Sequence, residues 1–228
     1  MTRATEKRIF LTRHAQAEHN VEDDYSIHDA PLTALGREQA RKLHEDVKDT
    51  IQQTAGLLVT SGLRRTMSTA IIGYATLRTR LEAEGKAVVV LPQLQECNEF
   101  PCDRGSSKEV LEADAEFAGL DLGNLTPDWN SKKGFYASDS KALKARAQWN
   151  RQWLRARPER DIVVVAHGDC LRYITDGENS LKPWANCEVR EYTFAVDAEE
   201  DEAGVAWLVL VQKVAQEGAD EPTSSALA

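Results

Sequence analysis

The sequence predicts an α/β fold: a three-layer sandwich with a mostly parallel central sheet and helices on both faces. Short apolar runs alternate along the chain with longer amphipathic stretches, an order typical of strand–helix units. The apolar run at residues 162–166 is continuous and rich in β-branched side chains, which is typical of a strand buried on both faces of a parallel sheet.

The remaining elements follow from the same patterns. The expected strands are, in chain order, residues 9–12, 57–60, 88–91, 162–166, 188–196 and 203–211. The expected helices are residues 34–53, 63–81 and 141–156. Thr33 is a suitable N-cap for the first of these helices, and Pro158 ends the third before the next strand begins.

A single domain is expected over residues 1–212, because a chain of 228 residues lies within the usual size of one domain. Residues 100–139 are rich in Gly, Pro, Asp, Asn and Ser and have no long periodicity. Such long irregular stretches usually serve as lids or binding loops, so a lid-like insertion is expected here. Residues 213–228 end in small and polar side chains and are expected to form a flexible tail.

Composition excludes several classes of protein. The chain has 28 Lys and Arg against 37 Asp and Glu, a net charge of −9, which disfavours binding to nucleic acid or anionic membranes. No apolar run approaches the roughly 20 residues of a membrane span, and no signal segment is evident at the N-terminus. The four cysteines contain no CxxC pair and are expected to be free thiols in a cytoplasmic protein.

Reactive side chains follow the expected strands at their carboxyl ends, where open α/β sheets bind ligands. In strand order these are Arg13 and His14, then Arg64 and Arg65, then Glu96, then His167. Arginine forks match phosphate oxygens, and nearby cations lower the pKa of a histidine and keep it neutral and nucleophilic. A carboxylic acid can protonate a leaving alkoxide and then activate water.

These groups predict a two-step phosphoryl transfer through phosphohistidine. A helix starting after His167 and Gly168 would add backbone donors for an anion. No metal or other cofactor is expected, because the arginines and the second histidine neutralise the developing charge. His19 and His28 lie near His14 in the sequence, but they lack the ordered ligand spacing of a zinc site.

Five segments resemble, in family order, the motifs of the histidine phosphatase (phosphoglycerate-mutase-like) superfamily. They are residues 13–20 (RHAQAEHN), 32–40 (LTALGREQA), 60–70 (TSGLRRTMSTA), 94–96 (LQE) and 166–168 (AHG). The resemblance implies that His14 is the phosphorylated nucleophile and Glu96 the general acid and base. It implies that a phosphate clamp is formed by Arg13, Arg65 and His167. It also implies that Asn20 is a further phosphate contact.

The departures from the family pattern are informative. Ala15 replaces the usual Gly of the RHG motif, and Gly62 replaces a Pro. The RHA variant with a later His-Asn, together with residues 101–106 (PCDRGS), resembles a branch that includes fungal mutase-like phosphatases. The residues after Glu96 do not resemble those of the glycolytic mutase, which argues against that activity.

The sequence therefore predicts a metal-independent phosphatase for a small phosphorylated metabolite, either a phosphomonoester or an organic diphosphate. Two alternatives stay open: a phosphomutase of the same chemistry, and a non-catalytic domain that binds a phosphorylated ligand. Arg104 is a candidate contact for a second anionic group of the substrate, or else a solvated loop charge. Neither the substrate's identity nor the oligomeric state follows from the sequence.

Overall fold

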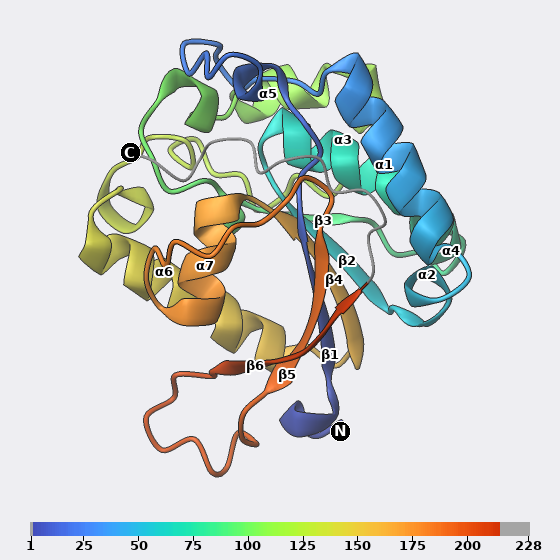
Figure 1. Ribbon diagram of the computed structural model, residues 1–228, viewed down its shortest axis with the longest axis vertical. Coiled ribbons are helices and arrows are strands. Elements are labelled where there is room, and N and C mark those ends of the chain that lie inside the picture. The colour runs from blue at the N-terminus through green and yellow to red at the C-terminus, as the bar shows by residue number, and fades with distance from the viewer. Residues whose placement is uncertain (1, 215–228) are drawn as a thin grey trace.

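The six strands of this computed structural model, which describes residues 2–214, form one mixed sheet (Figure 1). They are β1 (Arg8–Arg13), β2 (Leu57–Ser61), β3 (Val89–Leu91), β4 (Asp161–Ala166), β5 (Val189–Phe194) and β6 (Leu208–Val214). Their order across the sheet is β3-β2-β4-β1-β5-β6. Neighbours among β1 to β4 pair in parallel, and β5 and β6 add an antiparallel edge. The predicted α/β class and mostly parallel sheet are confirmed.

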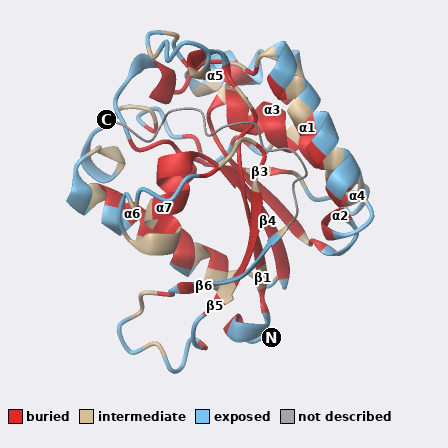
Figure 2. Ribbon diagram, in the orientation of Figure 1, coloured by how far each residue is buried: buried red, intermediate tan, exposed pale blue. Residues whose placement is uncertain are grey.

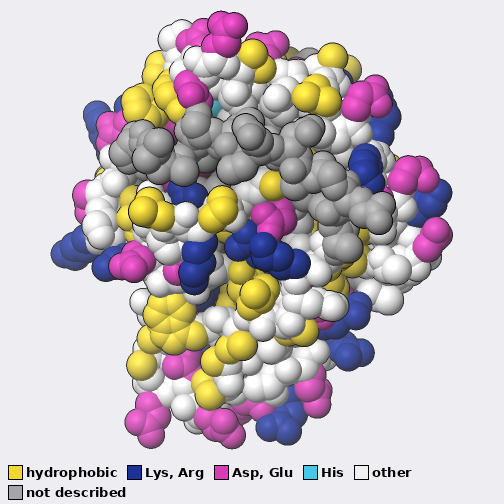
Figure 3. Space-filling model, in the orientation of Figure 1, with side chains coloured by type: hydrophobic (Ala, Val, Ile, Leu, Met, Phe, Trp, Pro, Cys, Tyr) yellow, Lys and Arg dark blue, Asp and Glu magenta, His cyan; other side chains and the backbone are white. Residues whose placement is uncertain are grey.

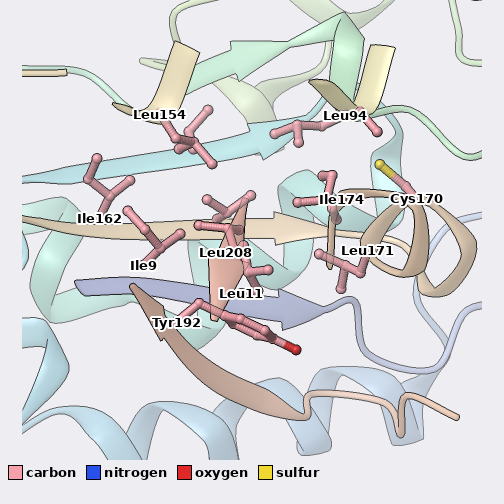
Figure 4. Packing of buried hydrophobic residues seen from close by; sticks show 14 of the residues in the cluster. Ile9, Leu11, Leu94, Leu154, Ile162, Cys170, Leu171, Ile174, Tyr192 and Leu208 are labelled. Atoms are coloured by element: carbon pink, nitrogen blue, oxygen red, sulfur yellow. The ribbon is translucent and has the colours of Figure 1, made fainter. Parts of the chain in front are cut away.

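Alternate side chains of the central strands enter two separate cores. Ile9 and Leu11 of β1 pack with Ile162 of β4 on one face, against α6 (Ser140–Ala156) and α7 (Gly168–Asp176) (Figure 4). Phe10 and the neighbouring Val163 pack on the other face, against α1 (Ala34–Val47), α2 (Ile51–Thr54), α3 (Arg64–Gly73) and α4 (Ala75–Ala83). The central strands are therefore buried on both sides, as Figure 2 shows in red.

Two expected helices are each divided in the structure. The stretch 34–53 forms α1 and α2, and the stretch 63–81 forms α3 and α4, with the second break at Tyr74. The buried side chain of Gln52 stabilises the break at Tyr74. It donates a hydrogen bond to the carbonyl of Gly73 (3.0 Å) and accepts one from the amide of Leu77 (3.0 Å). The Tyr74 hydroxyl bonds to Thr12 Oγ1 (2.6 Å). Because these contacts come from distant residues, helical periodicity does not reveal the breaks.

The closing strands also differ from the prediction. The last strand begins at Leu208 rather than at residue 203. Asp201 accepts hydrogen bonds from the amides of Val205 (3.2 Å) and Ala206, and so holds the preceding residues in a turn. Residues 213 and 214, expected in the tail, belong to β6; the rest of that expected tail lies outside the described residues.

Residues 100–139 contain short helices rather than a structureless loop. They are η4 (Pro101–Asp103), α5 (Lys108–Glu112), η5 (Ala115–Phe117) and η6 (Gly134–Tyr136). A third apolar cluster, which includes Phe117, Trp129 and Met67 of α3, joins this insertion to the sheet layer. Trp129 lies so close to Gly105 that a Cβ there would be 2.0 Å from the indole. The buried Trp129 thus requires glycine at this position.

No helix within residues 2–214 is long and apolar enough to cross a membrane.

Trp149 and Trp153 stack on each other, with ring centroids 6.4 Å apart, and pack against the core on the α6 side of the sheet.

Candidate active site

The loop after β1 is held in place by side chains from two helices. Thr69 of α3 accepts a hydrogen bond from the amide of Ala15 (3.0 Å), and Gln39 of α1 accepts one from the amide of Gln16 (2.8 Å). Gly36 allows α1 to approach, since a Cβ there would lie 1.9 Å from the Gln16 carbonyl oxygen. The motif residues of α1 and α3 therefore fix the backbone that carries His14.

His14 itself is buried, and its tautomer follows from a single contact. Nδ1 lies 2.7 Å from the carbonyl oxygen of Ala15, which can only accept, so Nδ1 carries the proton and Nε2 keeps a free lone pair. Burial lowers the pKa of His14 well below its ordinary value, and Arg65 and then Arg13 lower it further. The neutral imidazole was expected from the arginines alone, but burial is the larger cause of its low pKa.

Two buried arginines lie close to His14. Arg13 donates to the carbonyl of Trp184, and burial lowers its pKa to about 10. Arg65 donates to the carbonyl of Cys102 (2.6 Å) and to Asp103 (2.9 Å), while its Nε has no partner among residues 2–214. These bonds to η4 orient the Arg65 guanidinium and use two of its five N–H donors.

Arg64, the alternative to Arg65, points elsewhere. It is partly exposed and pairs with Asp114 at 2.6 Å.

His167 follows β4 and precedes α7, whose first residue is Gly168. Its Nε2 lies 2.9 Å from the hydroxyl of Ser61, and its Nδ1 has no partner within the described part of the chain. Its ring centroid is 5.2 Å from that of His14. Burial, followed by Arg65, lowers the pKa of His167 well below its ordinary value.

His19 and Asn20 lie on a short helix, η2 (Glu18–Asn20), beside His14. Asn20 accepts from the amide of Ala17 (3.0 Å) and its Nδ2 donates to His19 Nε2 (3.1 Å). The proton of neutral His19 is therefore on Nδ1, which has no partner among the described residues. Burial and the arginines lower the pKa of His19 to about 2, so this buried donor stays uncharged.

The carboxyl groups of Glu96 and Asp169 also line the pocket. Glu96 accepts hydrogen bonds from the amides of Cys97 (2.8 Å) and Cys170 (3.1 Å), the latter in the first turn of α7. Asp169 belongs to the same turn, pairs with Arg172 and accepts from Asn98 (3.3 Å). Burial, and then the Glu96 carboxylate, raise the pKa of Asp169 to about 7.

These side chains surround one small pocket. It is lined by Arg13, His14, His19, Asn20, Asp23, Tyr25, Glu96, Asn98, Phe100, Cys102, Asp103 and Asp169. Arg65 and His167 are not in this lining, but both lie next to His14. Arg104 is not in the lining: it donates to the carbonyls of Glu99 (3.3 Å) and Ser131 (3.3 Å).

Sequence reasoning missed two of these groups. His19 was considered only as part of the His-Asn motif and as a metal ligand, and Asp169 was given no catalytic or binding role. The position of Asp169, two residues after His167 at a strand end, was the available signal. Within residues 2–214, no three His, Cys, Asp or Glu side chains are arranged to hold a metal ion, and His28 is exposed.

Comparisons with known proteins identify the family of this chain. The sequence profile of the histidine phosphatase superfamily (branch 1) matches residues 9–193. A Schizosaccharomyces pombe protein named "probable phosphatase" is 30% identical over 175 residues, 75% of this chain and 78% of the relative. The phosphoglycerate mutase-like protein 1 of Arabidopsis thaliana is 26% identical over 81% of this chain and 79% of its own length.

Solved structures share the fold. The α-ribazole phosphatase of Shigella flexneri has a TM-score of 0.57 at 20% identity, over 91% of this chain and 96% of that one. A mycobacterial glucosyl-3-phosphoglycerate phosphatase has a TM-score of 0.53 at 22% identity, over 90% of this chain and 96% of that one. Given the profile match over most of its length, the chain belongs to branch 1 of the histidine phosphatase superfamily.

Proposed function

We propose that this phosphoric ester hydrolase cleaves small phosphomonoesters through a phosphohistidine at His14, without a metal ion. One observation carries the proposal: the unprotonated Nε2 of a neutral, buried His14 lies in a pocket with buried cationic and neutral donors around it. An uncharged imidazole is nucleophilic, and cationic and N–H donors around it can neutralise the charge of a transferring phosphoryl group.

In the first step His14 Nε2 attacks phosphorus in line with the leaving oxygen. Glu96 first takes up the proton of the bound phosphate monoanion. The P–N bond forms as the P–O bond to the alcohol breaks, and Glu96 gives that proton to the departing oxygen. Arg13 and Arg65 bind the equatorial oxygens of the transferring group, as forks that stay charged throughout. Because they are already fixed by bonds to the backbone and to Asp103, little reorganisation is needed.

In the second step Glu96, now a carboxylate, takes a proton from water. The water oxygen attacks phosphorus, the P–N bond breaks, and inorganic phosphate leaves with His14 neutral again. His167 and His19 contribute N–H donors to the phosphoryl oxygens, and their low pKa values keep them neutral between the steps. Asn20, which holds His19, is the further phosphate contact.

Phosphate release from a panel of esters, measured with a chelator present, tests the proposal. We expect turnover to survive the chelator and to fall about a thousandfold or more in His14→Ala. His28→Ala is the matched control, because His28 is exposed and does not line the pocket. Wild-type rates in His14→Ala, or loss of activity with the chelator, would overturn the proposal. Assaying isomerisation of phosphoglycerate alongside separates a mutase from a phosphatase.

A further inference from the structure

Two loops side by side form the outer wall of the pocket. The backbone amide of Cys102 donates to the carbonyl of Tyr25 (3.2 Å), and the Tyr25 and Phe100 rings stack at 5.1 Å with 24° between their planes. Buried Asp29 joins the loops by accepting from the amide of Ser106 (2.8 Å) and from its hydroxyl (2.7 Å). The outer pocket therefore has a fixed aromatic wall, with Phe100 41% exposed.

Charge around the pocket is distributed unevenly. Arg13 is the one Lys or Arg among the lining residues, and it is buried. Four lining residues carry carboxyl groups: Asp23, Glu96, Asp103 and Asp169. Asp103 is paired with Arg65, and Asp169 is paired with Arg172. Asp23 is exposed and accepts a hydrogen bond from the Tyr25 hydroxyl (3.1 Å).

The two ends of a bound ester must lie in different parts of this pocket. The phosphoryl group takes the buried donors, which include the unpartnered Nδ1–H of His19. The alcohol then lies toward Asp23 and the Tyr25–Phe100 pair. A second phosphate or carboxylate there would face carboxylates with no basic side chain in the lining, since Arg104 points to the backbone of Glu99 and Ser131.

We propose that the preferred substrate is the phosphate ester of an amino alcohol, whose ammonium or quaternary ammonium group binds between the Asp23 carboxylate and the Tyr25–Phe100 rings. Aromatic faces and carboxylates both attract such a cation. The assignment rests on the proposed phosphatase function and specifies its substrate class. It argues against an organic diphosphate, one of the two substrate types that the sequence left open.

Three esters that differ in one charge test this assignment. Phosphocholine, its uncharged carbon analogue 3,3-dimethylbutyl phosphate, and 3-(phosphonooxy)propanoate carry a positive, a neutral and a negative end group. We expect kcat/KM to fall in that order, by about fivefold at each step. Added salt should reduce the differences, because Asp23 is exposed and its charge is screened.

Two pairs of variants locate the preference. Asp23→Asn should reduce the ratio of kcat/KM for phosphocholine to kcat/KM for 3,3-dimethylbutyl phosphate. Asn suits this position because Asp23 has a φ of 55°. Asp24→Asn is its control, since Asp24 is exposed and does not line the pocket. Phe100→Leu should also reduce the preference, and Phe135→Leu, equally 41% exposed but outside the pocket, should not.

The outcomes separate the two proposals. Hydrolysis of the neutral or anionic ester as fast as phosphocholine would overturn the substrate assignment alone. An unchanged preference in Asp23→Asn would overturn the role given to Asp23 and its loop. No hydrolysis of any of the three esters would overturn both this assignment and the phosphatase function.

Discussion

At His14, burial and hydrogen bonding have separate effects. Burial and the arginines keep the ring uncharged, whereas the Ala15 carbonyl selects which nitrogen is free to attack. A sequence motif can place a histidine beside an arginine, but it does not show the tautomer. The same holds for His19, whose donor nitrogen is determined by the amide of Asn20.

Glu96 is the residue whose role depends on the leaving group. We expect Glu96→Gln to lower kcat about a hundredfold or more for an alkyl phosphate, and much less for p-nitrophenyl phosphate. The reason is that a nitrophenolate leaves without protonation, whereas an alkoxide does not. Steady-state rates for the two esters check this, and an equal loss for both would contradict a proton-donor role.

The buried carboxyl group of Asp169 should make the free energy of unfolding depend on pH. Its pKa of about 7 in the folded protein lies above the ordinary value of 3.8, so the folded state retains a proton that the unfolded chain has lost. Its contribution to stability is therefore present at low pH and is lost as the pH rises through about 7. Urea unfolding at about pH 5 and about pH 8 should show a larger fall in unfolding free energy for wild type than for Asp169→Asn. An equal fall in both would contradict the raised pKa.

At the scale of elements, the motif residues outside the pocket hold the loop that carries the nucleophile. Thr69 and Gln39 bind the backbone at Ala15 and Gln16, and Gly36 lets α1 approach it. These residues lie in segments that resemble the family's motifs. Their physical roles emerged only from the structure, because they depend on close approaches between residues far apart in the chain.

Gly36→Ala should therefore affect both stability and rate. A Cβ 1.9 Å from the Gln16 carbonyl oxygen forces α1 and the nucleophile loop apart, at a cost of about 1–3 kcal/mol in unfolding free energy. We expect kcat to fall as well, because His14 moves with the loop. Gly73→Ala is the matched control: its Cβ would meet the Leu43 side chain at 2.9 Å, away from the pocket. Gly73→Ala should lower stability without lowering kcat. If Gly36→Ala also kept the wild-type kcat, the positioning role given to Gly36 would be wrong.

Across the whole molecule, the sheet order brings the four strand ends to one edge. Apolar runs and strand–helix alternation were sufficient to predict the parallel sheet and the meeting of His14 with His167. They were insufficient to predict the helix break at Tyr74, which a buried Gln52 stabilises from elsewhere in the chain. Nor did they predict that Arg104 lies outside the pocket. Figure 3 shows acidic and basic side chains interspersed over the face in view, on a chain whose net charge is −9.

The four cysteines give a test of the packed fold as a whole. All are free and buried, and burial raises the pKa of each: to about 12 for Cys102, Cys170 and Cys187, and well above the ordinary value for Cys97. A thiol reagent should therefore label the native protein very slowly and label four thiols after denaturation. Rapid labelling of the native protein would contradict this packing, and fewer than four thiols in the denatured, unreduced chain would indicate a disulfide.

Identification of the covalent intermediate tests the central claim most directly. Wild-type enzyme mixed with a phosphate ester, quenched in alkali within one turnover and digested, should yield a phosphohistidine on the peptide that contains His14. The modification should be labile to acid and absent from His14→Ala. Phosphate release with no phosphorylated enzyme on that timescale, or with phosphate on another residue, would contradict the account.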